Sequence, residues 1–124
     1  MTIFNNSFTN EEIRWLNFIL KQDLETKDET YNFINQLSPQ NIVRDYSEYY
    51  KIIEFRTEET QNGYDGMSPM ICIQIIRKDG SAPTVITLYS KNDVPFEYEI
   101  YNADSSAINL DTIFDGEVVK IEEA

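Results

Sequence analysis

A chain of 124 residues has room for one domain, and its 41% hydrophobic and 13% aromatic content favours a folded domain over a disordered acidic tail. The formal net charge of −12 repels phosphates and anionic lipids, so we expect neither nucleic acid nor a membrane as a partner. The partner that this charge favours is a protein with a basic surface. The chain has no histidine and one cysteine, which excludes histidine-based catalysis, ordinary zinc sites and an intrachain disulfide.

From the composition of the first residues we expect no secretory signal. Residues 1–10 contain no basic side chain and no long apolar run, unlike a secretory signal. No stretch approaches the roughly 18 consecutive apolar residues of a membrane span. We therefore expect a cytoplasmic protein.

A first helix is expected from about residue 10. Thr9 and Glu12 have the spacing of a capping box, and Phe8 and Ile13 stand at the positions of a hydrophobic staple. The residues that follow repeat with helical spacing and form one apolar stripe, which comprises Ile13, Leu16, Ile19, Leu20 and Leu24.

A second helix is expected to begin at a second capping box. Thr26 and Glu29 again have the required spacing, and the helix is expected to end before Pro39 because the residue before a proline avoids the helical region. Only one or two residues separate the two apolar patterns. The sequence therefore predicts a helical hairpin or a bent pair over about 10–37.

The next part of the chain changes to an alternating pattern. Residues 49–56 alternate and are rich in β-branched and aromatic side chains, which predicts a strand. Residues 42–46 fit either a short strand or a loop. Residues 57–69 are polar and contain two glycines and a proline, so we expect a loop, and its length favours either a functional or a mobile segment.

Three consecutive strands are expected in residues 70–77, 84–90 and 95–101. Asp79-Gly80 predicts the first turn, and Lys91–Asp93 the second. Both faces of the first strand are largely apolar, so we expect it to be central and covered on both sides, with Cys72 as a buried, inert thiol. A short last strand is expected over 117–122.

Together these elements predict one domain, residues 1–124, of the α+β class. Two N-terminal helices are expected to pack on one face of an antiparallel, meander-type sheet of four to six strands spanning about 42–122.

The strand 95–101 carries the strongest candidate for a binding surface. Glu97, Glu99 and Tyr101 alternate onto one face, with neighbouring side chains about 7 Å apart. Such a row of carboxylates can mimic phosphates toward a basic cleft. Residues 93–124 hold nine acidic residues and one lysine, a net charge of −8 out of −12. The alternative is an ordinary solvated face of the sheet.

Two further clusters combine acids with tyrosine, a residue enriched in interface hot spots. One contains Tyr46 and Glu48, followed by two more tyrosines, and packing in the core or at an edge is an alternative for at least two of these rings. The other contains Tyr64 and Asp65 at the centre of the long loop. There a recognition tip and a plain Asp-Gly turn are equally compatible with the sequence.

A family resemblance adds to this interpretation. Asp65-Gly66-Met67-Ser68, Asp79-Gly80, the strand 96–101 and Asp104-Ser105 occur in an order that resembles a group of small bacterial proteins whose genes often accompany toxin genes. The resemblance covers about residues 9–110, implies an immunity protein, and brings no catalytic residue with it. The chain departs from the family pattern at Met67, where a glycine is missing, and at Ser68-Pro69, which replaces Gly-Ser.

The leading hypothesis is therefore a non-catalytic acidic protein that inhibits a cationic bacterial toxin domain. Its expected binding residues are Glu97, Glu99, Tyr101, Asp104, Tyr46, Glu48, Tyr64 and Asp65. No catalytic residue, metal ligand or cofactor is expected. One alternative is a structural or self-associating module whose acidity serves solubility, since edge strands leave a homodimer open. The other is a small-molecule enzyme that uses a carboxylate pair.

Overall fold

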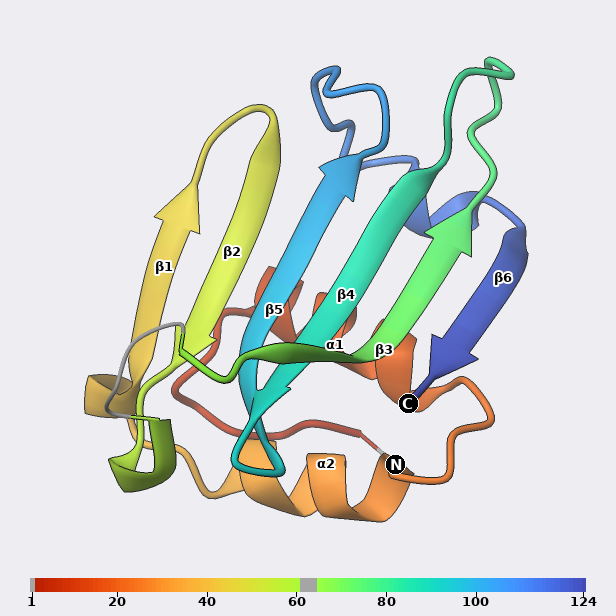
Figure 1. Cartoon of the computed structure of the whole chain (residues 1–124). Helices are drawn as coiled ribbons and strands as arrows, with labels where there is room; N and C mark the ends of the chain where they lie inside the picture. Colours follow the sequence, from red (N-terminus) through yellow and green to blue (C-terminus); the bar gives the residue numbers. More distant parts are fainter. Residues whose placement is uncertain (1, 61–64) are drawn as a thin grey trace.

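The protein folds into two layers. A computed structural model describes residues 2–60 and 65–124. Figure 1 shows a twisted six-stranded sheet with two helices on one of its faces, and every strand pair is antiparallel. This is the α+β arrangement expected from the sequence. The other side of the sheet, which carries Glu99 of β5, has no helix among the described residues, and we call it the open face.

Helix α1 spans Asn10–Leu20 and begins as predicted. The Thr9 hydroxyl accepts a hydrogen bond from the Glu12 N–H at 3.2 Å, and the Glu12 carboxylate accepts one from the Thr9 N–H at 2.8 Å. The apolar side of the helix is buried against the sheet. The buried Tyr98 hydroxyl of β5 donates to the Trp15 carbonyl at 2.9 Å, which joins the two layers by a polar contact as well.

Helix α2 spans Lys27–Asn35 and begins after Thr26 as expected, but the short link to α1 and the local capping box were wrong. Six residues, 21–26, separate the helices instead of one or two. Thr26 makes no side-chain cap. The carboxylate of Glu123, nearly a hundred positions along the chain, accepts hydrogen bonds from the N–H groups of Glu25 and Thr26 at 2.8 and 2.9 Å. A tertiary contact thus replaces the local cap, with a negative charge at the positive end of the helix.

The strands combine a meander with two added edges. In spatial order they lie β1-β2-β5-β4-β3-β6, so the predicted meander β3-β4-β5 forms the middle of the sheet. Short 3₁₀ turns cover Pro39–Asn41, Glu58–Thr60 and Ile113–Asp115. The strands are β1 (Ile42–Tyr46), β2 (Tyr50–Phe55), β3 (Ser68–Ile75), β4 (Thr84–Lys91), β5 (Val94–Asn102) and β6 (Val118–Glu123).

Three sequence-based expectations are resolved by this order. Residues 42–46 form a strand and not a loop. The strand β3 is next to the edge, and only its helix-facing side is fully buried, so the expectation that both sides are covered was wrong. Cys72 lies on the open side of β3 and is partly exposed instead of buried, with the Thr87 hydroxyl 3.7 Å from its sulfur.

The predicted hairpin turns are confirmed by their backbone angles. Asn92 and Asp93 both have positive φ, 52° and 65°, as a tight turn between two antiparallel strands requires. Gly80 has a φ of 76° in the turn between β3 and β4. These turns fix the register of the meander and therefore which side chains share a face.

Alternation along the strands divides the sheet into a core side and an open side. The core side packs under the helices and includes Ile53, Phe55, Ile71, Ile73, Ile75, Ile86, Leu88, Tyr98 and Ile100. In the described part of the chain, no helix is long and apolar enough to cross a membrane.

Candidate functional site: a tyrosine–glutamate hollow

Strand pairing brings together two clusters that are about fifty residues apart in the sequence. The strands β2 and β5 run antiparallel, with Tyr50 opposite Tyr101 and Ile52 opposite Glu99. The tyrosines that follow Glu48 therefore lie beside the acidic row of β5. This meeting point is near the end of the sheet where β2 begins and β5 ends (Figure 1).

A shallow hollow of about 310 Å³ opens at this point. Its floor is the open face between β2 and β5, and the exposed ring of Tyr49 stands at its rim. We call it the tyrosine–glutamate hollow. It is lined by Tyr49, Tyr50, Ile52, Glu99, Tyr101, Asn102 and Ser105.

Glu99 is the only acidic residue in this lining. Its side chain is partly buried, and burial raises the pKa of its carboxyl group above the ordinary value of 4.5. Across the residues that the structure describes, the Glu99 carboxylate has neither a hydrogen bond nor an ion pair. Directly opposite stand Ile52 and Thr87, neither of which carries a charge. The site thus holds an anion that has lost part of its water and has gained no partner.

Three tyrosines near Glu99, namely Tyr101, Tyr89 and Tyr49, stay protonated at neutral pH. Burial, and then the negative charge of Glu99, raise the pKa of Tyr101. Burial, followed by the charge of Glu99, likewise raises the pKa of Tyr89 on the neighbouring strand. A hydrogen bond with Glu48 raises the pKa of Tyr49. The rings therefore offer neutral aromatic faces around one carboxylate, an arrangement that attracts a cation.

Glu97 shares the face of Glu99 but is only 4% exposed. It lies toward the other end of β5, where it is opposite Glu54 of β2 and Tyr89 of β4. Figure 1 shows the chain that leads into β3 passing in front of this end of β5 and β4. The exposed row of two glutamates expected from the sequence is therefore reduced at the surface to Glu99.

Tyr46 belongs to a different site. It lies on the helix side of β1, where its hydroxyl bonds the Glu12 carboxylate and its ring packs edge-on to Trp15 at a centroid distance of 5.7 Å. Arg44 binds the same carboxylate through two nitrogens, at 2.5 and 2.8 Å. The sequence assigned Glu12 only to the helix cap, because Arg44 and Tyr46 lie more than thirty residues away. Tyr46 therefore supports the packing of α1 on β1.

Burial by itself would raise the pKa of Glu12, whose side chain is 1% exposed. The bonds from Arg44, Tyr46 and the Thr9 N–H, with the positive charge of Arg44, outweigh burial and lower this pKa below its ordinary value. Glu12 is thus an ionised and fully bonded carboxylate inside the protein.

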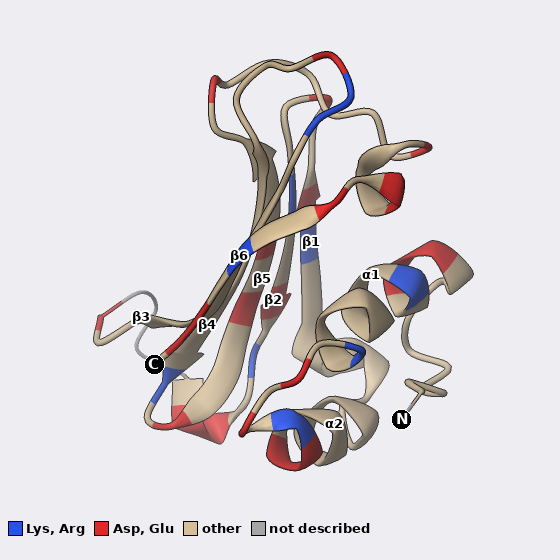
Figure 2. Ribbon diagram, turned by 90° about the vertical axis from the view of Figure 1, so that its right-hand side faces the viewer, with Lys and Arg blue, Asp and Glu red and all other residues tan. Residues whose placement is uncertain are grey.

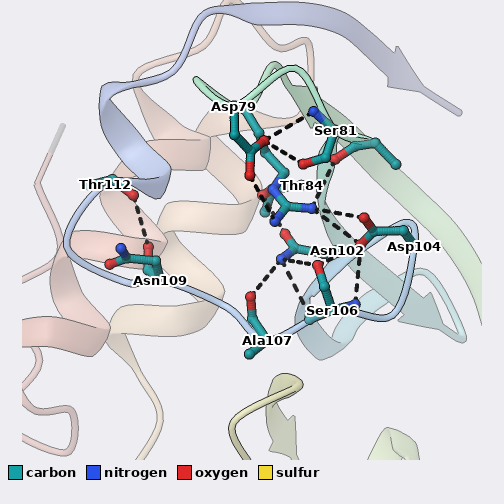
Figure 3. Close-up of polar contacts among 11 residues, drawn as sticks. Asp79, Ser81, Thr84, Asn102, Asp104, Ser106, Ala107, Asn109 and Thr112 are labelled. Carbon is teal, nitrogen blue, oxygen red and sulfur yellow. Dashed lines mark hydrogen bonds and ion pairs between the residues drawn. The ribbon is translucent and has the colours of Figure 1, made fainter.

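Asp104 lies in a second polar cluster, at the ends of β3 and β5 (Figure 3). Its carboxylate pairs with Arg77 at 3.1 Å and accepts a hydrogen bond from the Ser106 hydroxyl at 2.6 Å. Nearby, the buried Asn102 side chain bonds the Thr84 hydroxyl at 2.6 Å and the Ala107 carbonyl at 2.9 Å. These groups satisfy one another and join the β3–β4 turn to the loop after β5, which is a structural role.

The remaining predicted residues are not gathered at the hollow. Glu48 is exposed in the turn between β1 and β2, next to Tyr49, and its backbone carbonyl accepts a hydrogen bond from the Ile108 N–H at 2.8 Å. Asp65 is exposed and lies three residues before the start of β3, a strand that does not line the hollow. Tyr64 lies outside the described residues.

Sequence reasoning missed three residues of the lining, Ile52, Asn102 and Ser105. Nothing local marks them, because they reach the hollow only through the pairing of β2 with β5 and the turn after β5. Among the residues described, no group of three or more acidic, cysteine or histidine side chains is placed to hold a metal ion. Comparison of the chain with protein-family models, curated proteins and solved structures finds no match.

Proposed function

We propose that this protein is a non-catalytic binding protein whose tyrosine–glutamate hollow receives an arginine or lysine side chain of a basic partner protein. The observation that carries the proposal is Glu99, a partly buried carboxylate that has no partner among residues 2–60 and 65–124. Burying a charge without a partner costs free energy, and a cation placed in the hollow removes this cost. Inhibition of a cationic toxin domain is the biological role we infer for such binding.

The rings of the hollow favour arginine over lysine as the inserted side chain. A guanidinium is planar, stacks on aromatic faces and forms two parallel hydrogen bonds to one carboxylate. Tyr50 and Tyr101 stand directly opposite one another beside Glu99, and Tyr49 borders the same hollow. Tyrosine also loses little conformational entropy when a partner covers it.

The charge of the whole protein supports the encounter with such a partner. At a net charge of −12, the surface attracts a basic protein over distances comparable to the Debye length and raises the association rate at low salt. Long-range attraction does not select a site, however. The choice of site rests on Glu99 and the tyrosines of the hollow. Mutation can therefore separate the contribution of the net charge from the contribution of the hollow.

The first experiment probes the hollow alone. Acetylated, amidated arginine carries only the guanidinium charge, and its citrulline analogue has the same shape without the charge. Each compound is titrated into ¹⁵N-labelled protein, and the amide signals are followed by NMR. We expect the arginine compound to shift the amide signals of Tyr50, Glu99 and Tyr101, and the citrulline analogue to have little effect. Glu99→Gln should abolish the arginine response.

The second experiment tests the protein partner. Glu99→Gln and the control Glu117→Gln, an exposed residue outside the hollow, both change the net charge from −12 to −11. Wild type and Glu117→Gln should retain the same basic protein from a lysate of the cells that express this chain, and Glu99→Gln should lose it. Equal retention by all three would contradict the proposal.

A further inference from the structure

The outer edge of β6 is an unpaired strand edge. In the described sheet β6 pairs only with β3, and β1 and β6 are the two ends of the strand order. Figure 2 looks at the molecule from the β6 side, and no ribbon passes in front of this strand. Unpaired edges with free backbone groups are templates for adding another strand.

The register shows which backbone groups are free. The Ala124 N–H donates to the Met70 carbonyl at 3.0 Å, which continues the pairing of Cys72 with Glu122 and of Gln74 with Lys120. Antiparallel ladders alternate, so Lys120 and Glu122 turn their backbone groups toward β3. The residue between them, Ile121, turns its N–H and C=O away from the sheet.

Aliphatic side chains are exposed along the same edge. Val119 is 48% exposed and Ile121 is 41% exposed. Ile76, which follows β3 and donates its N–H to the Glu117 carbonyl at 2.8 Å, is 50% exposed. The exposed residues of the β1 edge are Arg44, Asp45 and Tyr46, and none of them is aliphatic.

We propose that β6 docks on β6 of a second copy of this chain, antiparallel and around a twofold axis at Ile121, to form one continuous sheet. This inference is independent of the proposed function, because the hollow lies between β2 and β5 and does not use β6. The interface is isologous, so it closes at a dimer.

Charge complementarity favours this register. Lys120 and Glu122 lie on the open face, where their charged groups are 2.7 Å apart. With Ile121 opposite its own copy, Lys120 of each chain stands opposite Glu122 of the other, and the pair occurs twice. A register centred on Lys120 or on Glu122 instead places like charges opposite one another, which is unfavourable.

The dimer is expected to be weak and to strengthen with salt. A six-residue strand buries less than the roughly 1,200 Å² of a standard stable interface. Each copy also carries a net charge of −12, and their mutual repulsion is screened as ionic strength rises. Binding of a basic partner through Glu99 has the opposite salt dependence, so the two associations are distinguishable.

Sedimentation equilibrium of the whole chain at several concentrations, at low and high salt, tests the proposal by charge reversal. Lys120→Glu should weaken the dimer at least tenfold, because it places a carboxylate opposite Glu122 of the second copy twice. The double variant Lys120→Glu/Glu122→Lys has the net charge of wild type and should restore the dimer constant to within about threefold, since both opposite-charge pairs form again with their signs exchanged.

A control separates this local effect from net charge. Lys78→Glu changes an exposed lysine in the β3–β4 turn and gives the same net charge as Lys120→Glu. It should leave the dimer close to wild type, and circular dichroism should show that all variants are folded. A wild type that stays monomeric throughout, a dimer unaffected by Lys120→Glu, or open-ended oligomers would overturn the proposal.

Discussion

Two partly or fully buried glutamates, one on each side of the sheet, differ in what surrounds them. Glu12 lies on the helix side, and Arg44, Tyr46 and the Thr9 N–H bond its carboxylate. Glu99 lies on the open face and has no partner in the described parts of the chain. The pKa of Glu12 is lowered and that of Glu99 is raised. A carboxylate whose bonds are all made within the fold serves the fold, whereas one left without bonds is free for a ligand.

The largest effect expected from this comparison is on stability. Glu12→Gln removes the charge that faces the Arg44 guanidinium and should lower the free energy of unfolding by about 2 kcal/mol, less than for a fully buried pair because the Arg44 side chain is 35% exposed. Glu99→Gln loses no bond and relieves an unpaired charge, so the free energy of unfolding should stay the same or rise. Urea denaturation of both variants measures the contrast. Equal losses would show that the two sites do not differ in this way.

The sequence identified the parts of this contrast that are local. The capping box at Thr9 is a pattern of four residues, and it was found. The alternation of β5 correctly placed Glu97, Glu99 and Tyr101 on one face. Such patterns depend only on residues that are close in the sequence, and they are sufficient to predict the fold class.

The rest of the contrast between Glu12 and Glu99 depends on contacts between segments that are distant in the sequence. Arg44 and Tyr46 reach Glu12 only because β1 packs beside α1, and Tyr50 meets Tyr101 only because β2 adds to the outer side of the meander. Alternation also cannot show that Glu97 is buried while Glu99, on the same face, is partly exposed. The hollow is therefore a product of strand order, which no single stretch of the sequence encodes.

A medium effect is expected on binding. Tyr101→Leu removes one aromatic face beside Glu99 and should weaken the binding of acetylated, amidated arginine by about 1 kcal/mol, roughly fivefold. Tyr101→Phe keeps the ring and removes only the hydroxyl, so it should bind nearly as wild type does. The two variants are compared by the same amide-shift titration. If the hydroxyl and not the ring were the important group, both variants would weaken binding equally.

The smallest effect is on the pH dependence of stability, where the two glutamates act with opposite sign. Between pH 4.5 and the raised pKa of Glu99, the native state holds more protons at this site than the unfolded state does, so this contribution to stability falls as pH rises. Glu12 has a lowered pKa, so its contribution is present above pH 4.5 and is lost as pH falls through the lower value.

Urea denaturation across this pH range measures both slopes. The difference in free energy of unfolding between Glu99→Gln and wild type should increase as pH rises above 4.5. The corresponding deficit of Glu12→Gln should shrink as pH falls below 4.5. If the differences between variant and wild type changed with pH in the same direction at both sites, the contrast between Glu12 and Glu99 would be contradicted.

The most direct test of the central claim is the pKa of Glu99 itself, measured from the ¹³C shift of its carboxyl group with and without acetylated, amidated arginine. We expect a pKa above the ordinary 4.5 in the free protein, and a fall in this pKa when the guanidinium binds, because a nearby positive charge favours the ionised form. The citrulline analogue should leave it unchanged. An ordinary pKa that arginine does not move would contradict the claim that Glu99 is kept unpaired to receive a cation.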